Sequence, residues 1–342
     1  MLKPTPSNSN VSSKESPYLS AIQMLSSTWI SRMVYLGVKR NIFKLIADGS
    51  KTIDQLITKL DIDPEVLSRV LKGMKHLGLL DANEENYDLT TISRLFVPNT
   101  PGNLCSMAIL WGEEFSNSWG EIESAILDNT SGFQKFYKMD LFSYLSQHHK
   151  TAESFDKAME SLAFHIYPSI AKALPLIGIK QVVDVGGGSG FLARTINEIY
   201  KDIEVTVFDL DHVIERAKNS TSDFDKINFI SGNFFTEVPA SNLHILANII
   251  HDWNDEDALK ILKTIKKAQT NQGILCLIEM VIDHPNEPSL ARSTDLNMLM
   301  LTGGKERSKE ELSLILKEAG FFIENLINIE NATCLVIARH IT

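Results

Sequence analysis

From about Leu176 onward, short apolar runs alternate with longer segments whose apolar residues recur at helical spacing. Helical spacing is found in FLARTINEIY, DEDALKILKTIKKA and KEELSLILKEAG, and the runs predicted to form strands are QVVDV, VTVF, INFI, HILANII, ILCLIEMV, FFIENLINI and TCLVIA. This alternation is typical of a parallel sheet with helices on both faces. Only about Glu330 to Ala332 separates the last two runs, which predicts an antiparallel hairpin at the end of a seven-stranded α/β sheet.

The first hundred residues follow a different pattern. Residues 1–16 are rich in Ser, Asn, Pro and Lys, and this composition predicts a disordered tail. Thr52 is placed to cap a helix in IDQLITKL, and Pro64 suits the first turn of a second helix. The apolar side of that second helix is predicted to carry Val66, Leu67, Val70, Leu71 and Met74. Two short extended runs around a turn at Asn83 to Asn86 follow, so the order predicts a mainly helical winged-helix domain over residues 17–100.

The middle of the chain, residues 101–174, is mostly helical in pattern and rich in aromatic side chains, among them Trp111, Phe115, Trp119, Phe133 and Phe136. Most of these are expected to be core residues, because aromatic side chains bury large apolar areas. We interpret this segment as a helical linker that also lines a substrate pocket. Residues 175–342 are then predicted to form the α/β domain.

Charge and composition exclude several classes of protein. The formal net charge is -10, and even residues 1–100 carry a net of only +2, whereas a nucleic-acid-binding protein needs a strongly basic face. No run of 18 apolar residues occurs, so no membrane association is expected. Cys105, Cys276 and Cys334 form no CxxC pair, so neither a zinc site nor a disulfide framework is predicted. We expect a protein of the reducing cytoplasm that holds no metal.

The strongest motif is VVDVGGGSG at residues 182–190, where a buried strand leads into a glycine loop and a helix. Glycines let the backbone approach a ligand closely, and open α/β sheets bind ligands at the carboxyl ends of their strands. Asp209 ends the next strand, 23 residues after Gly186, where a carboxylate accepts hydrogen bonds from ribose hydroxyls. The pattern therefore predicts a nucleotide-type cofactor.

Two details favour S-adenosylmethionine over NAD as this cofactor. The loop reads GGGSG rather than GxGxxG, and Asp184 precedes it by two residues, where its carboxylate can lie near the amino group of a methionine moiety. At the end of the third strand, Asn233 is a candidate partner of the adenine base. Phe234 is a candidate to stack on that base, although core packing explains Phe234 equally well.

Four motifs, VDVGGGSG, FDLDHVIERA, HDWNDEDALKIL and GGKERSKEEL, resemble in order and spacing the caffeate-type small-molecule O-methyltransferases of plants and their bacterial relatives in polyketide and phenazine tailoring. The resemblance is strong from about Leu176 to Ala338 and looser in the N-terminal region. It implies a Rossmann-like methyltransferase sheet, an N-terminal dimerisation domain, and methyl transfer to a hydroxyl of a small, aromatic or polyketide-like secondary metabolite. Two departures are Asn233, where the family usually has Asp, and Ala247, where plant members have Lys.

The resemblance also implies roles for individual residues. His251 matches the general base, and a histidine with a near-neutral pKa is suited to deprotonate a phenol. Glu279 and Glu306 match two acidic residues that orient it, and which of them does so stays open. The expected cofactor contacts are Asp184, Gly186, Gly188, Asp209, Leu210, Asn233, Phe234 and Asn248. The candidate acceptor contacts are Met159, Phe164, Asp252, Met298, Leu299 and Thr302.

Other interpretations remain. A non-methylating member of the same fold would use the cofactor for hydroxylation, decarboxylation or pericyclic ring formation, but the presence of His251, Glu279 and Glu306 together favours methylation. A winged-helix regulator would need a stronger basic footprint than this chain has. The segment from Leu19 to Leu36 is apolar on nearly all sides of a helix, which predicts a homodimer through the N-terminal region.

Overall fold

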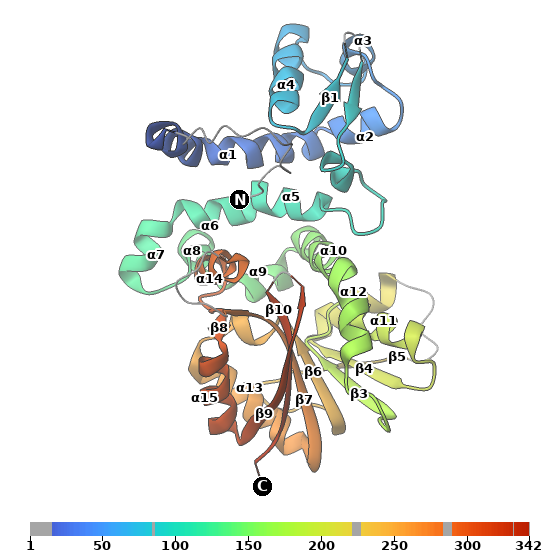
Figure 1. Ribbon diagram of the computed structural model, residues 1–342, viewed down its shortest axis with the longest axis vertical. Helices are drawn as coiled ribbons and strands as arrows, with labels where there is room; N and C mark the ends of the chain where they lie inside the picture. Colours follow the sequence, from blue (N-terminus) through green and yellow to red (C-terminus); the bar gives the residue numbers. More distant parts are fainter. Residues whose placement is uncertain (1–15, 84–85, 221–226, 283–288, 331, 342) are drawn as a thin grey trace, which may run out of the picture. The chain divides into compact units, whose positions relative to one another are not determined.

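A computed structural model describes residues 16–83, 86–220, 227–282, 289–330 and 332–341 (Figure 1). Contacts divide the chain into two units, Met1–Ser93 and Arg94–Thr342. The sequence placed this boundary near residue 100. The predicted tail lies, except for Ser16, outside the described residues. Within the described ranges, no helix is both long enough and apolar enough to cross a bilayer.

The N-terminal unit is mainly helical and contains one small hairpin. Its helices are α1 (Pro17–Lys39), α2 (Ile42–Ala47), α3 (Ile53–Ile57) and α4 (Pro64–His76), and its strands β1 (Leu80–Ala82) and β2 (Tyr87–Leu89) pair antiparallel. Thr52 caps α3 as predicted, because its side chain accepts a hydrogen bond from the Gln55 amide in a capping box. Local sequence signals therefore set where these short helices begin.

One residue of α4 departs from the prediction. Leu67, Leu71 and Met74 are fully buried, but Val66, predicted on the same side, is 49% exposed. The three buried residues are spaced by four and three positions, so they lie above one another on the helix. Val66 is one position away from Leu67, about 100° round the helix axis, and this turns its side chain towards solvent.

The second unit begins with a series of helices. They are the 3-10 helix η1 (Ser93–Phe96, which spans the boundary), α5 (Cys105–Gly112), α6 (Glu114–Gly120), α7 (Ile122–Asp128), α8 (Gly132–Tyr137), α9 (Leu141–Gln147) and α10 (His149–Ala173). Phe115 and Phe133 are core residues, as expected of most aromatic side chains here. Trp111, Trp119 and Phe136 are not, since they are 56%, 37% and 46% exposed, so the expectation fails for three of the five aromatic residues named above.

All seven runs predicted as strands form one sheet, in the order β5–β4–β3–β6–β7–β10–β9. The strands are β3 (Gln181–Val185), β4 (Glu204–Asp209), β5 (Ile227–Ser231), β6 (Ser241–Ala247), β7 (Gln269–Ile282), β9 (Phe321–Glu330) and β10 (Thr333–His340). The first five are parallel, and β10 is antiparallel to both β7 and β9, which confirms the predicted sheet and hairpin. Asn331, in the predicted turn, lies outside the described residues. A two-residue strand that the pattern did not predict, β8 (Arg307–Ser308), pairs with the end of β7.

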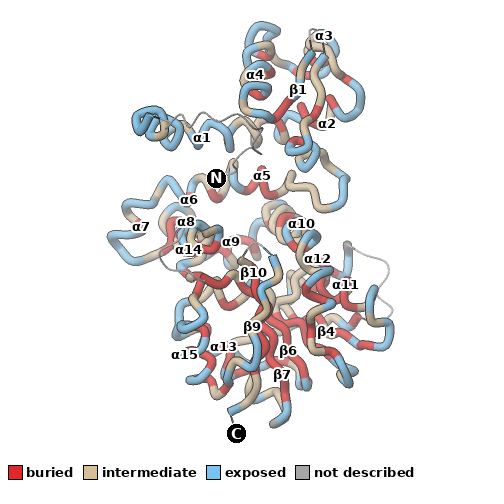
Figure 2. The backbone as a smooth tube through the Cα atoms, viewed as in Figure 1, coloured by how far each residue is buried: buried red, intermediate tan, exposed pale blue. Residues whose placement is uncertain are grey.

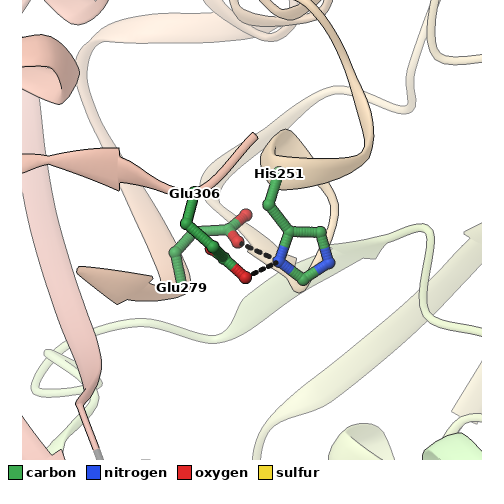
Figure 3. Close-up of side chains that lie close together, drawn as sticks. All are labelled: His251, Glu279 and Glu306. Atoms are coloured by element: carbon green, nitrogen blue, oxygen red, sulfur yellow. Dashed lines mark ion pairs between the residues drawn. The ribbon is translucent and has the colours of Figure 1, made fainter. Parts of the chain in front are cut away.

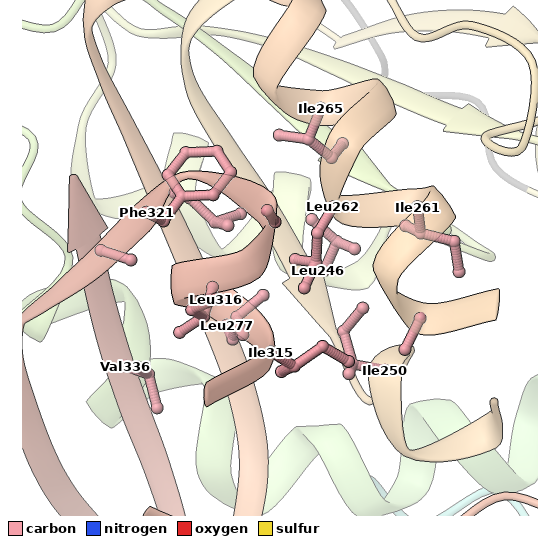
Figure 4. Close-up of a cluster of buried hydrophobic side chains, with 14 of the residues drawn as sticks. Leu246, Ile250, Ile261, Leu262, Ile265, Leu277, Ile315, Leu316, Phe321 and Val336 are labelled. Carbon is pink, nitrogen blue, oxygen red and sulfur yellow. The ribbon is translucent and has the colours of Figure 1, made fainter. Parts of the chain in front are cut away.

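Helices cover both faces of this sheet. On one face, α13 (Asp255–Ala268) and α15 (Lys309–Ala319) pack against sheet residues such as Leu246 and Leu277 (Figure 4). The other face is covered by α11 (Phe191–Ile199), α12 (Asp211–Ser220) and the C-terminal end of α10. Ile170, near that end of α10, is fully buried. The central strands β3, β6 and β10 are mostly buried, whereas the edge strands β5 and β9 are largely exposed or partly buried (Figure 2). This packing holds the carboxyl ends of β3, β4, β6 and β7 rigidly at one edge.

Candidate active site

The loop after β3 is shaped by glycines with positive φ, including Gly186 at 71° and Gly188 at 55°. Residues with a side chain rarely adopt these angles. The Gly188 amide donates to Asp209 Oδ2 at 2.9 Å, and the Leu210 amide donates to Asp209 Oδ1 at 2.7 Å. Burial raises the pKa of Asp209 to about 6, against the effect of these two amides. The loop and the predicted ribose carboxylate therefore lie together at the carboxyl edge of the sheet.

Asp184 lies inside the sheet just before this loop. Its side chain is 1% exposed, and neither carboxylate oxygen has a hydrogen-bond partner among the described residues. Burial raises its pKa to about 7, and the charge of Asp209 adds to this effect. A buried carboxylate without a partner is costly. It fits a ligand that brings a cationic group, such as the ammonium of a methionine moiety, to this depth.

Three further predicted cofactor contacts lie on neighbouring strand ends. Asn233 Oδ1 accepts a hydrogen bond from the Phe235 amide at 2.9 Å, so this oxygen has a partner within its own loop. Phe234 packs against the core beside α13, so packing accounts for part of its surface. Asn248 has a positive φ of 56° and its Nδ2 donates to the Tyr167 hydroxyl at 3.4 Å. Such strain in a residue other than glycine is often found at functional sites.

Tyr167, on α10, was not among the predicted residues. Burial raises the pKa of its phenol, and the charges of Asp184 and Glu279 raise it further. The phenol therefore lies within electrostatic reach of both the cofactor-side carboxylate and the histidine cluster described next. The only sequence signal was its membership of the aromatic-rich segment, which did not separate it from core residues.

His251 lies on the 3-10 helix η2 (Ile250–Asp252), directly after β6. Its Nδ1 is 3.2 Å from Glu279 Oε2 and 3.3 Å from Glu306 Oε1 (Figure 3). Its Nε2 points away from both carboxylates and lies 3.9 Å from Asp252 Oδ1. A hydrogen on Nδ1 is stabilised by this arrangement, which leaves the lone pair of Nε2 to accept a proton. The structure thus brings together all three predicted catalytic residues.

The two carboxylates beside Nδ1 have different surroundings. Glu279 Oε1 accepts hydrogen bonds from the amides of Ile249 and Ile250, at 3.1 and 2.7 Å, and these fix the position of its carboxylate. Among the described residues, His251 Nδ1 lies at ion-pair distance from Glu279 Oε2 and Glu306 Oε1 without a well-aligned hydrogen bond, Glu306 Oε2 has no hydrogen-bond partner, and the Glu306 side chain is fully buried. Burial raises the pKa of Glu306, the contact with His251 lowers it, and nearby Glu279 and Asp295 raise it.

The protonation of the cluster follows from these charges. Burial lowers the pKa of His251, but the charges of Glu279 and Asp252, together with the Nδ1 contacts to Glu279 and Glu306, outweigh it, so the pKa is raised well above its usual value. Burial also raises the pKa of Asp252 to about 7. An imidazole so surrounded is a stronger base than a histidine in water, because its protonated form is stabilised.

Residues 304–307, just before α15, hold the η2 turn in place. The Lys305 amide donates to the carbonyl of His251 at 2.8 Å, and a Cβ on Gly304 would overlap that same carbonyl oxygen. Arg307, 2% exposed, donates to the carbonyls of Ile250 and Trp253, both at 2.8 Å. Arg307 directly follows Glu306 in the motif GGKERSKEEL, but the sequence alone indicated no role for it.

The candidate acceptor contacts lie on three elements. Asp252 is beside His251. On α10, Met159 packs against a core cluster that includes Phe133, and Phe164 is 39% exposed with its ring 6.3 Å from that of Phe191, the first residue of α11. Those at the end of α14 (Leu290–Leu301) are Met298, Leu299 and Thr302. Thr302 Oγ1 accepts a hydrogen bond from the Gly304 amide, which ties the end of α14 to the segment that touches His251.

A second buried histidine shows the contrast with His251. His244, on β6, is fully buried, with Nε2 at 2.9 Å from the carbonyl of Pro239 and Nδ1 at 3.2 Å from Gln269 Nε2. Both ring nitrogens are satisfied, and burial lowers its pKa to about 4. His244 is therefore a neutral structural residue.

A hollow of about 400 Å³ lies at the opposite, amino-terminal edge of the sheet. It is lined by Pro175, Ile177, Ile179, Asn242, Gln272, Ile274 and Arg339. Arg339 is its charged lining residue, and it pairs with Glu324 at 3.0 Å. None of the groups described above lies here, so this hollow is separate from the candidate active site.

Comparison with known proteins agrees with the geometry. The profile of the O-methyltransferase domain matches residues 119–322, and that of the O-methyltransferase dimerisation domain matches residues 22–99. The chain is 28% identical over 325 residues to the phenazine O-methyltransferase PhzM of Lysobacter antibioticus, covering 94% of this chain and 95% of that protein. It is 25% identical over 323 residues to a phenazine-1-carboxylate N-methyltransferase of Pseudomonas aeruginosa, covering 93% and 96%.

Among solved structures, human N-acetylserotonin methyltransferase in complex with S-adenosylmethionine has the same fold. The TM-score is 0.90 at 24% identity, with 97% of this chain and 100% of that chain covered. The seven-stranded sheet, the N-terminal dimerisation domain and the resemblance seen in the four sequence motifs are thereby confirmed. The chain belongs to the O-methyltransferase family.

Proposed function

We propose that this protein transfers the methyl group of S-adenosylmethionine to a hydroxyl of a small aromatic or polyketide-like secondary metabolite, with His251 as general base. The observation that carries the proposal is the orientation of the His251 ring. Two buried carboxylates engage Nδ1, Nε2 points away from them, and the ring lies at the same sheet edge as the glycine loop and Asp209. Family membership and the methyltransferase relatives support the same reaction.

The residues of this chain have distinct tasks in that reaction. Bound S-adenosylmethionine would supply a sulfonium methyl group for transfer to an acceptor oxygen. Asp209 would hold the ribose hydroxyls, and Asp184 would pair with the ammonium of the methionine moiety. His251 Nε2 removes the acceptor proton, because a phenol is a poor nucleophile until it is deprotonated. The acceptor is held between Asp252, α10 and the end of α14.

Glu279 and Glu306 have different roles in this scheme. Glu279 is the partner that fixes the His251 tautomer and stabilises the imidazolium, because two backbone amides hold its other oxygen in place. Glu306 is the neutral partner, because it is fully buried and lacks such donors among the described residues. A glutamine has the shape of a protonated glutamic acid, so the two roles are separable by substitution.

The experiment compares three variants by mass spectrometry, with labelled S-adenosylmethionine and a panel of phenols, polyketides and aromatic amines. His251→Ala should lower turnover about 10²–10⁴-fold, the range for a positioned base, while S-adenosylhomocysteine still binds. Methylation of amines but not hydroxyls would instead assign an N-methyltransferase, as one relative is named. Retention of near-full activity in His251→Ala would refute the role of the base.

The pH profile distinguishes the two glutamates. Turnover should rise with pH through the raised pKa of His251, since only the neutral imidazole accepts a proton. Glu279→Gln removes the anion that stabilises the imidazolium, so the rise should move to lower pH and the maximal rate should fall. Glu306→Gln, the matched control, should leave both nearly unchanged. The reverse order would assign the ionised role to Glu306. Addition of EDTA should leave every rate unchanged.

We also propose a homodimer formed through α1. Its outward side chains include Leu19 (55% exposed), Met24 (63%), Leu25 (77%) and Trp29 (69%). An apolar surface of this extent normally packs against a partner. The matched dimerisation domain over residues 22–99 supports a second copy of the same chain as that partner. Light scattering should therefore give about twice the mass of 38.3 kDa.

A further inference from the structure

Helix α10 carries two carboxylates one turn apart, Asp156 and Glu160. Each is paired with an arginine on a helix that follows a predicted cofactor-binding segment. Arg194 lies on α11, which follows the glycine loop, and Arg216 lies on α12, which follows Asp209. Side chains of the four are 17–38% exposed, so the pairs are partly shielded from solvent.

The Glu160 pair differs from the other because it includes the glycine loop itself. Ser189 Oγ donates to Glu160 Oε2 at 3.1 Å, and Arg194 Nη2 donates to Glu160 Oε1, also at 3.1 Å. Arg194 Nη1 donates to the backbone carbonyl of Ser189 at 2.7 Å. Glu160, Ser189 and Arg194 therefore form a closed ring of three contacts that joins α10 to the loop.

The Asp156 pair joins the same helix to α12 without touching the loop. Arg216 Nε donates to Asp156 Oδ2 at 2.8 Å, and its Nη1 donates to the His212 carbonyl at 3.0 Å, within α12. It is an ion pair of the same type on the same side of α10. Asp156 is thus a matched control for any effect of Glu160 that merely reflects attachment of the helix.

The position of Glu160 on α10 gives the ring its significance. Met159, the preceding residue, and Phe164, four residues on, are candidate acceptor contacts, and the Phe164 ring lies 6.3 Å from that of Phe191 at the start of α11. The loop that approaches the cofactor and the helix that lines the acceptor side are therefore directly bonded, through side chains that the reaction itself does not use.

We propose that Glu160 is a positioning residue that couples the glycine loop to α10, so that cofactor binding orders the acceptor side of the site. This inference rests on the proposed function. A cofactor that fixes the loop also fixes Ser189 and Arg194, and these hold Glu160 and with it the middle of α10. Acceptor binding then meets an already ordered helix, and coupling of this kind typically changes an affinity roughly 5- to 150-fold.

The test is amide hydrogen exchange with and without saturating S-adenosylhomocysteine, on the full chain. In the native protein the ligand should slow exchange both in the glycine loop and in residues 156–167 of α10, the latter about fivefold or more. Glu160→Ala should keep the protection of the loop and lose that of α10, whereas Ser189→Ala, which leaves Arg194 bonded to both Glu160 and the Ser189 carbonyl, should lose only part of the α10 protection. Glu160→Gln, which keeps an acceptor for Ser189, should restore part of it. Asp156→Ala should leave the ligand-dependent protection of α10 in place.

The outcomes separate this inference from the function on which it rests. Protection of α10 that persists in Glu160→Ala, or that is lost equally in Asp156→Ala, overturns the coupling role while the proposed function stands. Protection of the loop alone in the native protein does the same. Absence of protection anywhere, together with no shift in melting temperature on adding S-adenosylhomocysteine, overturns the proposed function and the coupling role with it.

Discussion

The turn that carries His251 depends on the guanidinium of Arg307. This side chain is 2% exposed and donates to the carbonyls of Ile250 and Trp253, each at 2.8 Å. Its Nε and Nη2 also donate to Asp255 Oδ1, at 3.0 and 2.8 Å. In an Arg307→Leu variant, all of these acceptors lose the guanidinium at once, although Ile250 keeps the Trp253 amide and Asp255 keeps Lys305 as a partner, while the volume of the side-chain stem is largely retained.

The expected loss in the free energy of unfolding depends on how far each of these acceptors is exposed to water. Removing one partner of a fully buried ion pair costs about 3–5 kcal/mol. The Asp255 side chain is 62% exposed, so water replaces much of its loss. The carbonyl of Ile250 keeps one donor, the Trp253 amide at 3.3 Å, whereas the carbonyl of Trp253 loses the guanidinium, and an unsatisfied buried acceptor costs about 1–3 kcal/mol. We therefore expect Arg307→Leu to lower the free energy of unfolding by about 2–4 kcal/mol, or the melting temperature by roughly 4–8 °C.

The assay is thermal and urea unfolding of the variant beside Arg339→Leu. Arg339 pairs with Glu324 at 3.0 Å, but both side chains are more than 30% exposed (34% and 46%), so this control should lose less than about 1 kcal/mol. Turnover of Arg307→Leu, measured at a temperature where it is folded, should also fall, because the base is no longer held. A loss below about 1 kcal/mol, equal to that of the control, would refute the role given to Arg307.

Three further predictions concern the cofactor and the dimer. S-adenosylhomocysteine should raise the melting temperature, since it binds only the folded state, and Asp209→Ala should lose most of that shift; stabilisation by NAD instead would contradict the cofactor assignment. Affinity for S-adenosylhomocysteine should rise about tenfold from pH 6 to pH 8, because Asp184, with a pKa of about 7, pairs with the ammonium only when ionised. Calorimetry of Asp184→Asn should show a weaker, flatter dependence. Trp29→Glu should halve the mass seen by light scattering, and a native protein that is already monomeric would disprove the dimer.

Several features of the protein were set by short stretches of sequence. The alternation of apolar runs with helical periodicity determined the seven strands and their closing hairpin, because period and run length are local properties. The glycine loop and Asp209 were likewise recognisable. A tight turn with positive φ favours glycine, and the end of a strand can be located from the strand's own apolar run without knowing its neighbours. Val66 shows the limit of such reasoning even within one helix, because its exposure of 49% depends on which neighbour covers that side.

The active site itself was decided by tertiary structure. His251, Glu279 and Glu306 are separated by 28 and 27 residues, and the sequence left open which glutamate holds the histidine. The structure places both at Nδ1 but supplies backbone amides to Glu279 alone among its described contacts. Arg307 and Glu160 were given no role because a charged residue in a helical or loop pattern has the same signature as a solvated one. Only the packing of other elements around a charge determines whether it is exposed to water or held by a buried partner, and that packing is not a local property of the chain.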